Sequence, residues 1–196
     1  MWSSVRPPKP DKARAVPVAL NCSLVSRRTL LGGLAATLVG LQTGSAIART
    51  VRRLTLIRQS SREVGYDLSF WRDGAPDRQG LAKLDWLMRD VHAGQVNRID
   101  LRVYYLLSML QTEFGGRPIG VTSGYRTKAT NERLRQQGLD AARYSFHLRG
   151  RAADVNIEGV SPARVAMLGS LFGLGGVGLY RNFVHLDTGP RRFWTG

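Results

Sequence analysis

The stretch that decides the fold and the chemistry of this chain is residues 145–154, which read S-F-H-L-R-G-R-A-A-D. It places the imidazole of His147 seven residues before the carboxylate of Asp154. Gly150 permits a sharp or closely packed turn between them, because glycine adopts backbone angles that other residues avoid. The two small alanines before Asp154 let the strand that follows pack tightly. The spacing alone is also compatible with a histidine on a surface loop and an aspartate that caps a helix.

A second histidine lies beside a carboxylate in residues 183–187, which read F-V-H-L-D. Because side chains alternate along a strand, His185 and Asp187 share one face of it. Two imidazoles and one carboxylate are the protein ligands of an open catalytic zinc site. Zinc lowers the pKa of its water to about 7 and polarises a carbonyl, and a nearby second carboxylate serves as general base. The histidines therefore indicate a metal site.

Hydrophobic periodicity predicts a domain of mixed helices and strands. The elements alternate too irregularly for a purely parallel sheet, so we expect the α+β class. We expect strands at 51–58, 63–71, 119–122, 152–157 and 183–187, and helices at 77–91, 100–114 and 127–137. A further helix opens at Ser161-Pro162, and a glycine-rich link covers 173–178.

The first 48 residues are typical of an export signal. Arg27 and Arg28 precede an uncharged run, 29–48, that ends in the small-x-small pattern Ala46-Ile47-Ala48. Paired arginines before such a run favour the twin-arginine route. The alternative is a retained membrane anchor, since about 20 apolar residues can span a bilayer. We expect a signal at 1–48 and a periplasmic domain at 49–196, opening with a β-hairpin extension at 49–75, without stable membrane insertion after cleavage.

Charge and cysteine content limit the possible functions. The chain has 29 Lys+Arg and 14 Asp+Glu; six of the basic residues and one acidic residue precede position 49, which leaves +10 on the remainder. An exported chain does not meet cytoplasmic nucleic acid, so an acidic cell-wall polymer or an anionic membrane surface is the expected partner. The alternative is that the charge reflects only a bias in composition. Because Cys22 is the only cysteine, disulfide scaffolds, cysteine zinc fingers, iron–sulfur clusters and thiol nucleophiles are excluded from the domain.

The mature chain resembles the murein endopeptidase K family of the D-alanyl-D-alanine carboxypeptidase and VanX-like zinc peptidases, over roughly residues 50–195. Residues 145–154 match the pattern S-x-H-x-x-G-x-A-x-D at every fixed position. The other shared features are the arginine-pair leader, S-G-Y-R at 123–126, N-E at 131–132, G-G-V-G at 175–178, and N-F-V-H-L-D-T-G-P at 182–190 before Trp194.

This resemblance implies a fold similar to that of the hedgehog and D-Ala-D-Ala peptidase proteins, in which helices flank a small antiparallel sheet that carries zinc. It implies that peptidoglycan cross-links are cleaved and that the zinc ligands are His147, Asp154 and His185. Many relatives carry a catalytic Glu, Asp or His where this chain has Asn182, and an amide is no base at neutral pH. Asp187 is therefore the candidate base, with an exchange of the ligand and base roles of His185 and Asp187 left open.

Arg126 occupies the position where the family directs an arginine toward the substrate. A fixed guanidinium can hold the scissile carbonyl as it becomes an oxyanion, or clamp a substrate carboxylate; an arginine on a solvated turn is the alternative. Ser145 is a candidate for orienting a ligand, and His92 is expected at a solvated helix end. The favoured function is a zinc murein endopeptidase. The alternatives are a D-alanyl-D-alanine carboxypeptidase and a non-catalytic wall-binding module that retains the metal pocket.

Overall fold

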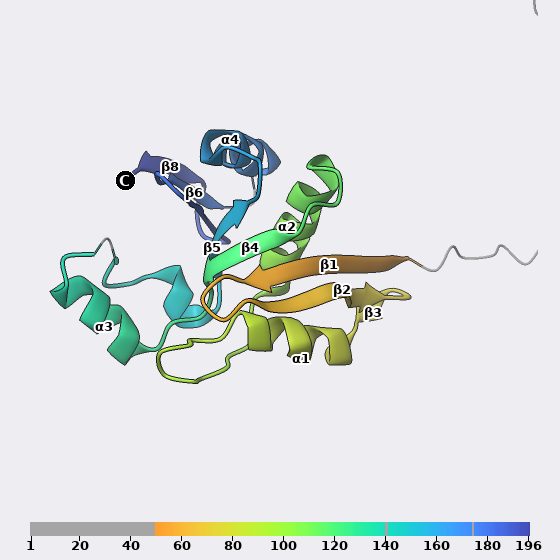
Figure 1. Ribbon diagram of the computed structural model, residues 1–196, viewed down its shortest axis with the longest axis horizontal. Coiled ribbons are helices and arrows are strands. Elements are labelled where there is room, and N and C mark those ends of the chain that lie inside the picture. The colour runs from red at the N-terminus through yellow and green to blue at the C-terminus, as the bar shows by residue number, and fades with distance from the viewer. Residues whose placement is uncertain (1–49, 140, 174) are drawn as a thin grey trace, which may run out of the picture. The chain divides into compact units, whose positions relative to one another are not determined.

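Eight β-strands form one sheet in the order β3-β2-β1-β4-β5-β7-β6-β8 (Figure 1). The computed structural model describes residues 50–139, 141–173 and 175–196, which belong to one compact unit, Ala46–Gly196. The export signal predicted at 1–48 lies outside the described residues. The strands are β1 Val51–Arg58, β2 Glu63–Arg72, β3 Ala75–Pro76, β4 Ile119–Ser123, β5 Ala152–Ile157, β6 Gly176–Leu179, β7 Val184–Asp187 and β8 Arg192–Thr195.

The sheet is mixed, which corrects the expected small antiparallel sheet. β1 runs parallel to β4, and β6 runs parallel to β8. The section β4-β5-β7-β6 is antiparallel throughout. The α+β class is confirmed, but the antiparallel part that carries Asp154 and His185 is only the centre of a larger sheet.

The hairpin of β1 and β2 is an integral part of this sheet. Its two strands pair antiparallel, and Leu56 of β1 lies beside Ile119 of β4. Leu54 and Leu56 are completely buried, as is Phe70 on β2. Since these side chains help to form the main hydrophobic core, the hairpin contributes to the core of the domain.

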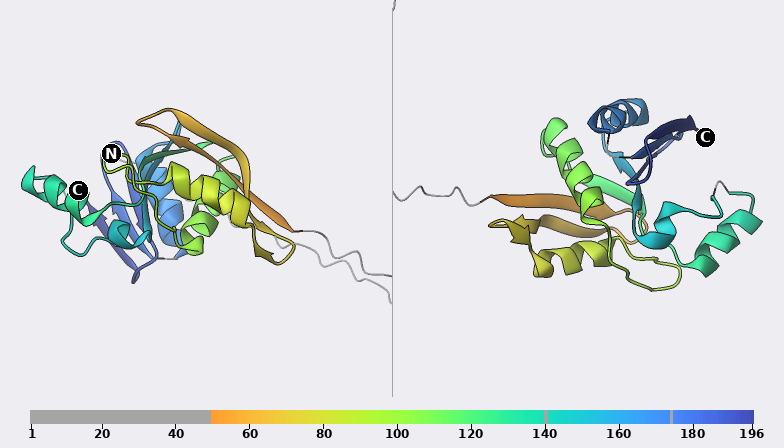
Figure 2. Two further views of the ribbon diagram at one scale, coloured as in Figure 1. Left: turned by 90° about the horizontal axis from the view of Figure 1, so that it is seen from below. Right: turned by 180° about the vertical axis from the view of Figure 1, so that it is seen from behind.

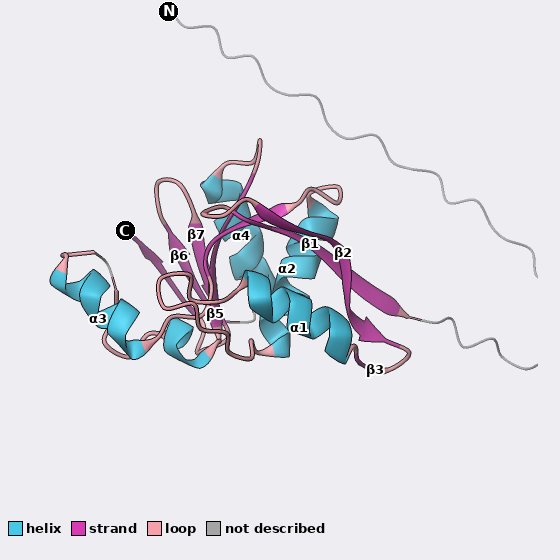
Figure 3. Ribbon diagram, turned by 60° about the horizontal axis from the view of Figure 1, so that its bottom comes forward, coloured by secondary structure: helices cyan, strands magenta, loops and turns pink. Residues whose placement is uncertain are grey.

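In the part of the chain that the structure describes, four α-helices accompany the sheet: α1 Arg78–Leu87, α2 Leu101–Glu113, α3 Lys128–Gln136 and α4 Pro162–Phe172. Each of the first three begins at an N-cap residue whose side chain accepts backbone N–H groups of the helix. These N-cap residues are Asp77, Asp100 and Thr127. α1, α2 and α4 supply buried side chains to the core, among them Leu84, Leu107 and Val165. α3 is polar and stands apart from the other helices, at the end of the domain away from β3 (Figures 2 and 3).

Three sequence predictions are wrong in detail. The helix expected to reach residue 91 ends at Leu87, since the chain then turns and Asp90 bridges Gln95. The expected glycine-rich link at 173–178 contains most of β6, and β8 was not expected at all. The side chains of β6 show almost none of the pattern that predicts a strand. These residues form one because their backbone pairs with β7 and β8.

Alternation along β5 and β7 separates the core from the site. Ala153, Val155, Val184 and Leu186 belong to the core, so the alternate residues Asp154 and His185 face the other side of the sheet. No helix in the described part of the chain is long and apolar enough to cross a membrane.

Candidate metal centre and active site

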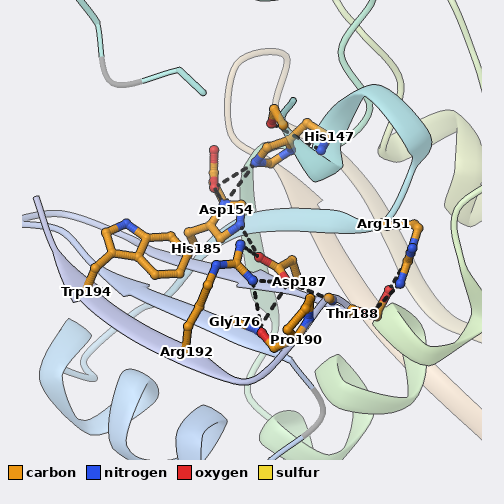
Figure 4. Close-up of polar contacts among 12 residues, drawn as sticks. His147, Arg151, Asp154, Gly176, His185, Asp187, Thr188, Pro190, Arg192 and Trp194 are labelled. Atoms are coloured by element: carbon orange, nitrogen blue, oxygen red, sulfur yellow. Dashed lines mark hydrogen bonds and ion pairs between the residues drawn. The ribbon is translucent and has the colours of Figure 1, made fainter. Parts of the chain in front are cut away.

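Three side chains from three different elements converge on one point (Figure 4). Asp154 on β5 is paired directly with His185 on β7, and His147 comes from the short 3-10 helix η1, Phe146–Arg149. Oδ1 of Asp154 lies 2.8 Å from Nδ1 of His185 and 3.1 Å from Nε2 of His147. The two histidine nitrogens are 3.1 Å apart. The arrangement brings together the three residues predicted as metal ligands.

The local sequence explains why His147 reaches this point. Ser145 opens η1, and its hydroxyl accepts the backbone N–H of His147 at 3.3 Å. Gly150 ends the turn with φ 62°. A Cβ at Gly150 would lie 2.2 Å from the carbonyl oxygen of Arg98, so no other residue fits without displacing backbone. The seven-residue spacing thus contains one helical turn and one left-handed glycine before β5 begins.

Each imidazole has a hydrogen-bond acceptor on the nitrogen that faces away from the shared centre. Nδ1 of His147 lies 2.6 Å from the carbonyl oxygen of Gly124, which only accepts hydrogen bonds. Nδ1 therefore carries the proton, and the lone pair on Nε2 points to the shared centre. On His185 the nitrogens are reversed: Nε2 donates to Oδ2 of Asp187 at 3.0 Å, and Nδ1 faces the centre. Metal-binding histidines almost always have such a partner on the second nitrogen.

The ligand atoms of His147, Asp154 and His185 all lie within 4.8 Å of one another. Two imidazole nitrogens and one carboxylate oxygen are the donor set of an open zinc site. The three donors therefore fit such a metal in kind and proximity, and the second nitrogen of each imidazole is already held by a partner.

Asp187 is completely buried behind His185. Oδ1 accepts from the backbone N–H groups of Gly176 and Gly189, at 3.1 and 2.8 Å, and from Nη1 of Arg192 at 3.1 Å. Oδ2 accepts from Nε2 of His185 and from Nη2 of Arg192 at 2.6 Å. Burial alone would raise the pKa of Asp187, but these hydrogen bonds outweigh it and hold the pKa well below its usual range. Asp187 is therefore a carboxylate whose two oxygens are already engaged by five donors.

The pKa values of the two histidines are shifted in opposite directions. Burial lowers the pKa of His147 and outweighs the attraction of Asp154. Burial also acts to lower the pKa of His185, but the hydrogen bonds to Asp154 and Asp187 outweigh it, so that pKa is raised. The carboxylates on both sides of His185 thus favour its charged form when no metal competes for Nδ1.

Arg126 lies against the same centre. Its Nη2 donates to Oδ2 of Asp154, and its Nε donates to Oγ of Ser123 at 2.7 Å. The side chain is only 14% exposed, so the guanidinium does not lie on a solvated turn. Oδ1 of Asp154 faces the histidines while Oδ2 holds Arg126.

These residues open into a pocket of about 260 Å³. Its walls are largely aromatic, with Tyr144, Phe146, Tyr180, Phe183 and Trp194 among the lining side chains. Asp154 is the only carboxylate among the described residues that line it, and Asn182 is not part of the lining.

Sequence reasoning missed Arg192, which lines the pocket and binds Asp187, and the Gly124 carbonyl that holds His147. A backbone carbonyl leaves no sequence signal. Arg192 follows Asp187 by five residues across a Gly-Pro turn, and without β8 nothing indicated that it returns to the site. His92 is exposed as expected, but it lies in a turn beyond the end of α1.

Residues 46–194 match the model of the family described as peptidoglycan L,D-endopeptidase MepK. The chain belongs to this family. Within the MepK family, it is 41% identical over 120 residues to a Haemophilus influenzae protein named probable peptidoglycan L,D-endopeptidase MepK, covering 59% of this chain and 64% of the relative. It is 39% identical over 120 residues to the Escherichia coli K12 peptidoglycan L,D-endopeptidase MepK, covering 60% and 66%.

The chain therefore spans a little less than two thirds of these MepK relatives. No solved structure matches it.

Proposed function

We propose that this protein is a periplasmic, zinc-dependent murein endopeptidase that hydrolyses peptide cross-links of peptidoglycan. The observation that carries the proposal is the convergence of His147, Asp154 and His185, with the outer nitrogen of each imidazole held by a hydrogen-bond acceptor. The names of the MepK relatives support peptidoglycan as the substrate.

In this proposal His147 would bind zinc through Nε2, His185 through Nδ1 and Asp154 through Oδ1. Zinc bound there would supply a Lewis acid for the scissile carbonyl and would lower the pKa of the attacking water. The Gly124 carbonyl and Asp187 hold the two rings in place, and Arg126 holds the second oxygen of Asp154.

Arg126 is the proposed catalytic arginine. Its guanidinium lines the pocket beside Asp154, and two of its nitrogens are fixed by Ser123 and Asp154. A preorganised cation at this position stabilises the charge that develops on the carbonyl oxygen, without reorganisation during the reaction.

We assign Asp187 a positioning role in place of the base role expected from the strand face. Its oxygens are directed at Nε2 of His185, at Arg192 and at two backbone N–H groups, on the far side of the imidazole from Nδ1. A base must reach the proton that it removes, and a ligand exchange with His185 would require Asp187 to leave all these donors.

The proposed place of action is the periplasm, reached by a cleaved twin-arginine signal at 1–48. The substrate implied by the family is located there. The net charge of +10 on residues 49–196 suits an acidic wall polymer, and no role with nucleic acid is proposed.

One observation favours a second candidate, a non-catalytic wall-binding module that retains the metal pocket. Asn182 replaces the usual acid, and Asp154 is the only carboxylate among the described lining residues. Such a module would bind both zinc and peptidoglycan but leave the cross-links intact.

Digestion of purified peptidoglycan sacculi separates the two candidates. The zinc-loaded protein should convert cross-linked muropeptides to monomers, a chelator should stop the conversion, and added zinc should restore it. Sedimentation of the protein with intact sacculi, with no change in the muropeptide profile at full zinc content, would favour the binding module and contradict the proposed activity.

A further inference from the structure

Arg192 lines the pocket and is held by Asp187, Phe146 and Trp194. Figure 4 shows its guanidinium next to Asp187. Its two terminal nitrogens bind the two oxygens of Asp187, at 3.1 and 2.6 Å. Its guanidinium carbon lies 5.1 Å from the ring centre of Phe146 and 4.9 Å from that of Trp194. The charged group is therefore held between two aromatic rings and a buried carboxylate.

The strand beneath leaves room for this arrangement. Arg192 on β8 pairs with Gly176 on β6, and Trp194 pairs with Gly178. A Cβ at Gly176 would lie 2.4 Å from Nη1 of Arg192, and a Cβ at Gly178 would lie 2.5 Å from the indole of Trp194. The two glycines allow both side chains to lie flat against β6.

One edge of the Arg192 guanidinium remains available. Asp187 and the Pro190 carbonyl take donors of Nη1 and Nη2, while Nε has no hydrogen-bond partner among residues 50–139, 141–173 and 175–196. The side chain is 40% exposed and lines the pocket that holds the three metal-binding side chains. A planar guanidinium binds a carboxylate through two parallel N–H groups, and Nε with one Nη forms such a pair.

The charges of the pocket favour an anion at this edge. Arg126 is neutralised by Asp154, and Arg192 by Asp187. A divalent cation bound at the proposed site leaves an excess of positive charge. A carboxylate on the ligand would neutralise part of this excess positive charge.

We propose that Arg192 binds a free carboxylate of the substrate close to the scissile bond, and thereby selects peptides that carry this carboxylate over their carboxamide forms. The inference rests on the proposed function for its substrate class. It assigns Arg192 a specificity role separate from that of Arg126.

The test uses two peptides that differ only in a carboxylate or a carboxamide beside the cross-link. Their dissociation constants for the zinc-loaded protein are measured by calorimetry, and KM and kcat are measured by product release. The carboxylate peptide should bind roughly 10- to 100-fold more tightly, the range for a hydrogen bond to a charged group. The difference should appear in KM more than in kcat.

Arg192→Lys keeps a positive charge beside Asp187 but removes the planar edge, so it should bind the two peptides about equally while keeping its zinc. Arg181→Lys, at an exposed arginine outside the pocket lining, should discriminate like the wild type. Discrimination that Arg192→Lys retains in full would overturn the inference.

The wild type alone can also overturn the proposal, whether or not the variant folds. Equal affinity for the two peptides, or no binding of either, overturns the proposal. Selective binding without cleavage would leave the role of Arg192 standing and contradict the peptidase activity. Cleavage of both peptides with equal KM would support the peptidase activity and contradict the role of Arg192.

Discussion

Nε2 of His185 lies 3.0 Å from Oδ2 of Asp187, while Nδ1 of the same ring faces Asp154 at 2.8 Å. The imidazole thus links two carboxylates, one at the proposed metal centre and one buried behind it. A carboxylate that accepts the second N–H of a metal-binding histidine fixes the ring and makes it a stronger ligand.

Replacement of Asp187 by Asn distinguishes orientation from base catalysis. If Asp187 orients His185, Asp187→Asn should weaken zinc affinity about 10- to 100-fold, and saturating zinc should recover much of the activity. Zinc titration followed by kcat at saturation measures both.

A base role predicts the reverse pattern, with unchanged zinc affinity and a kcat that is about 10²- to 10⁴-fold lower at full occupancy. That result would contradict the positioning role. Asp67→Asn, at an exposed aspartate of the hairpin, serves as the control and should change neither quantity.

The two histidines at 147 and 92 form a matched pair for the metal assignment. His147 is buried at the centre and His92 is exposed in a turn. His147→Ala should abolish stoichiometric zinc binding, because two remaining ligands hold the ion poorly, and His92→Ala should bind zinc as the wild type does. Asp154→Ala should behave like His147→Ala. Elemental analysis of the dialysed proteins gives the answer, and full zinc content in His147→Ala would show that the site is elsewhere.

Much of this centre followed from sequence because its chemistry is local. The ten residues from 145 to 154 contain the cap, the left-handed glycine, the first two proposed ligands and the start of β5. The strand pattern at 183–187 placed His185 and Asp187 on one face. The three predicted ligands therefore meet as the sequence indicated.

What the sequence did not reveal depends on pairing between distant segments. Parallel pairing of β1 with β4 joins residues about sixty positions apart, and β8 is held by β6. The positioning role that we propose for Asp187 was not visible in the sequence for the same reason: sharing a face with His185 does not tell which ring nitrogen the carboxylate meets. The Asp187 carboxylate meets Nε2 because Arg192 and the N–H groups of Gly176 and Gly189 hold it there.

Asp90 should make stability depend on pH. It is 2% exposed, and its oxygens accept the backbone N–H and hydroxyl of Thr127 at 2.8 and 2.9 Å and the N–H groups of His92 and Ala93. Burial acts to raise its pKa, but these hydrogen bonds outweigh it, so the pKa is lowered on folding. The stabilisation is then present above the unfolded pKa of about 3.9 and is lost as the pH falls toward the folded value.

Asp90→Asn places an amide NH₂ against these donors, so it should reduce the free energy of unfolding at pH 7 by about 1–3 kcal/mol. Urea denaturation should show that the difference from the wild type shrinks below about pH 4. A difference that stays constant down to pH 3 would show that folding does not lower the pKa of Asp90. Asp67→Asn is the exposed control.

Gly178→Ala tests the close packing of β8 on β6. The added Cβ would lie 2.5 Å from the Trp194 ring, so the indole must move or the strands must separate. We expect a loss of about 1–3 kcal/mol, as for other overpacked sites, together with a change in tryptophan fluorescence. An unchanged denaturation midpoint and emission spectrum would show that Trp194 does not lie on Gly178 in solution.

We expect His147, Asp154 and His185 to bind the metal ion that the hydrolysis of a peptidoglycan cross-link requires. The most direct measurement is mass spectrometry of one defined cross-linked muropeptide after incubation with the purified protein. We expect two products separated at the cross-link peptide bond when zinc is present, and intact substrate with chelator or with His147→Ala. An intact substrate in the presence of folded, zinc-loaded wild-type protein would contradict the claim.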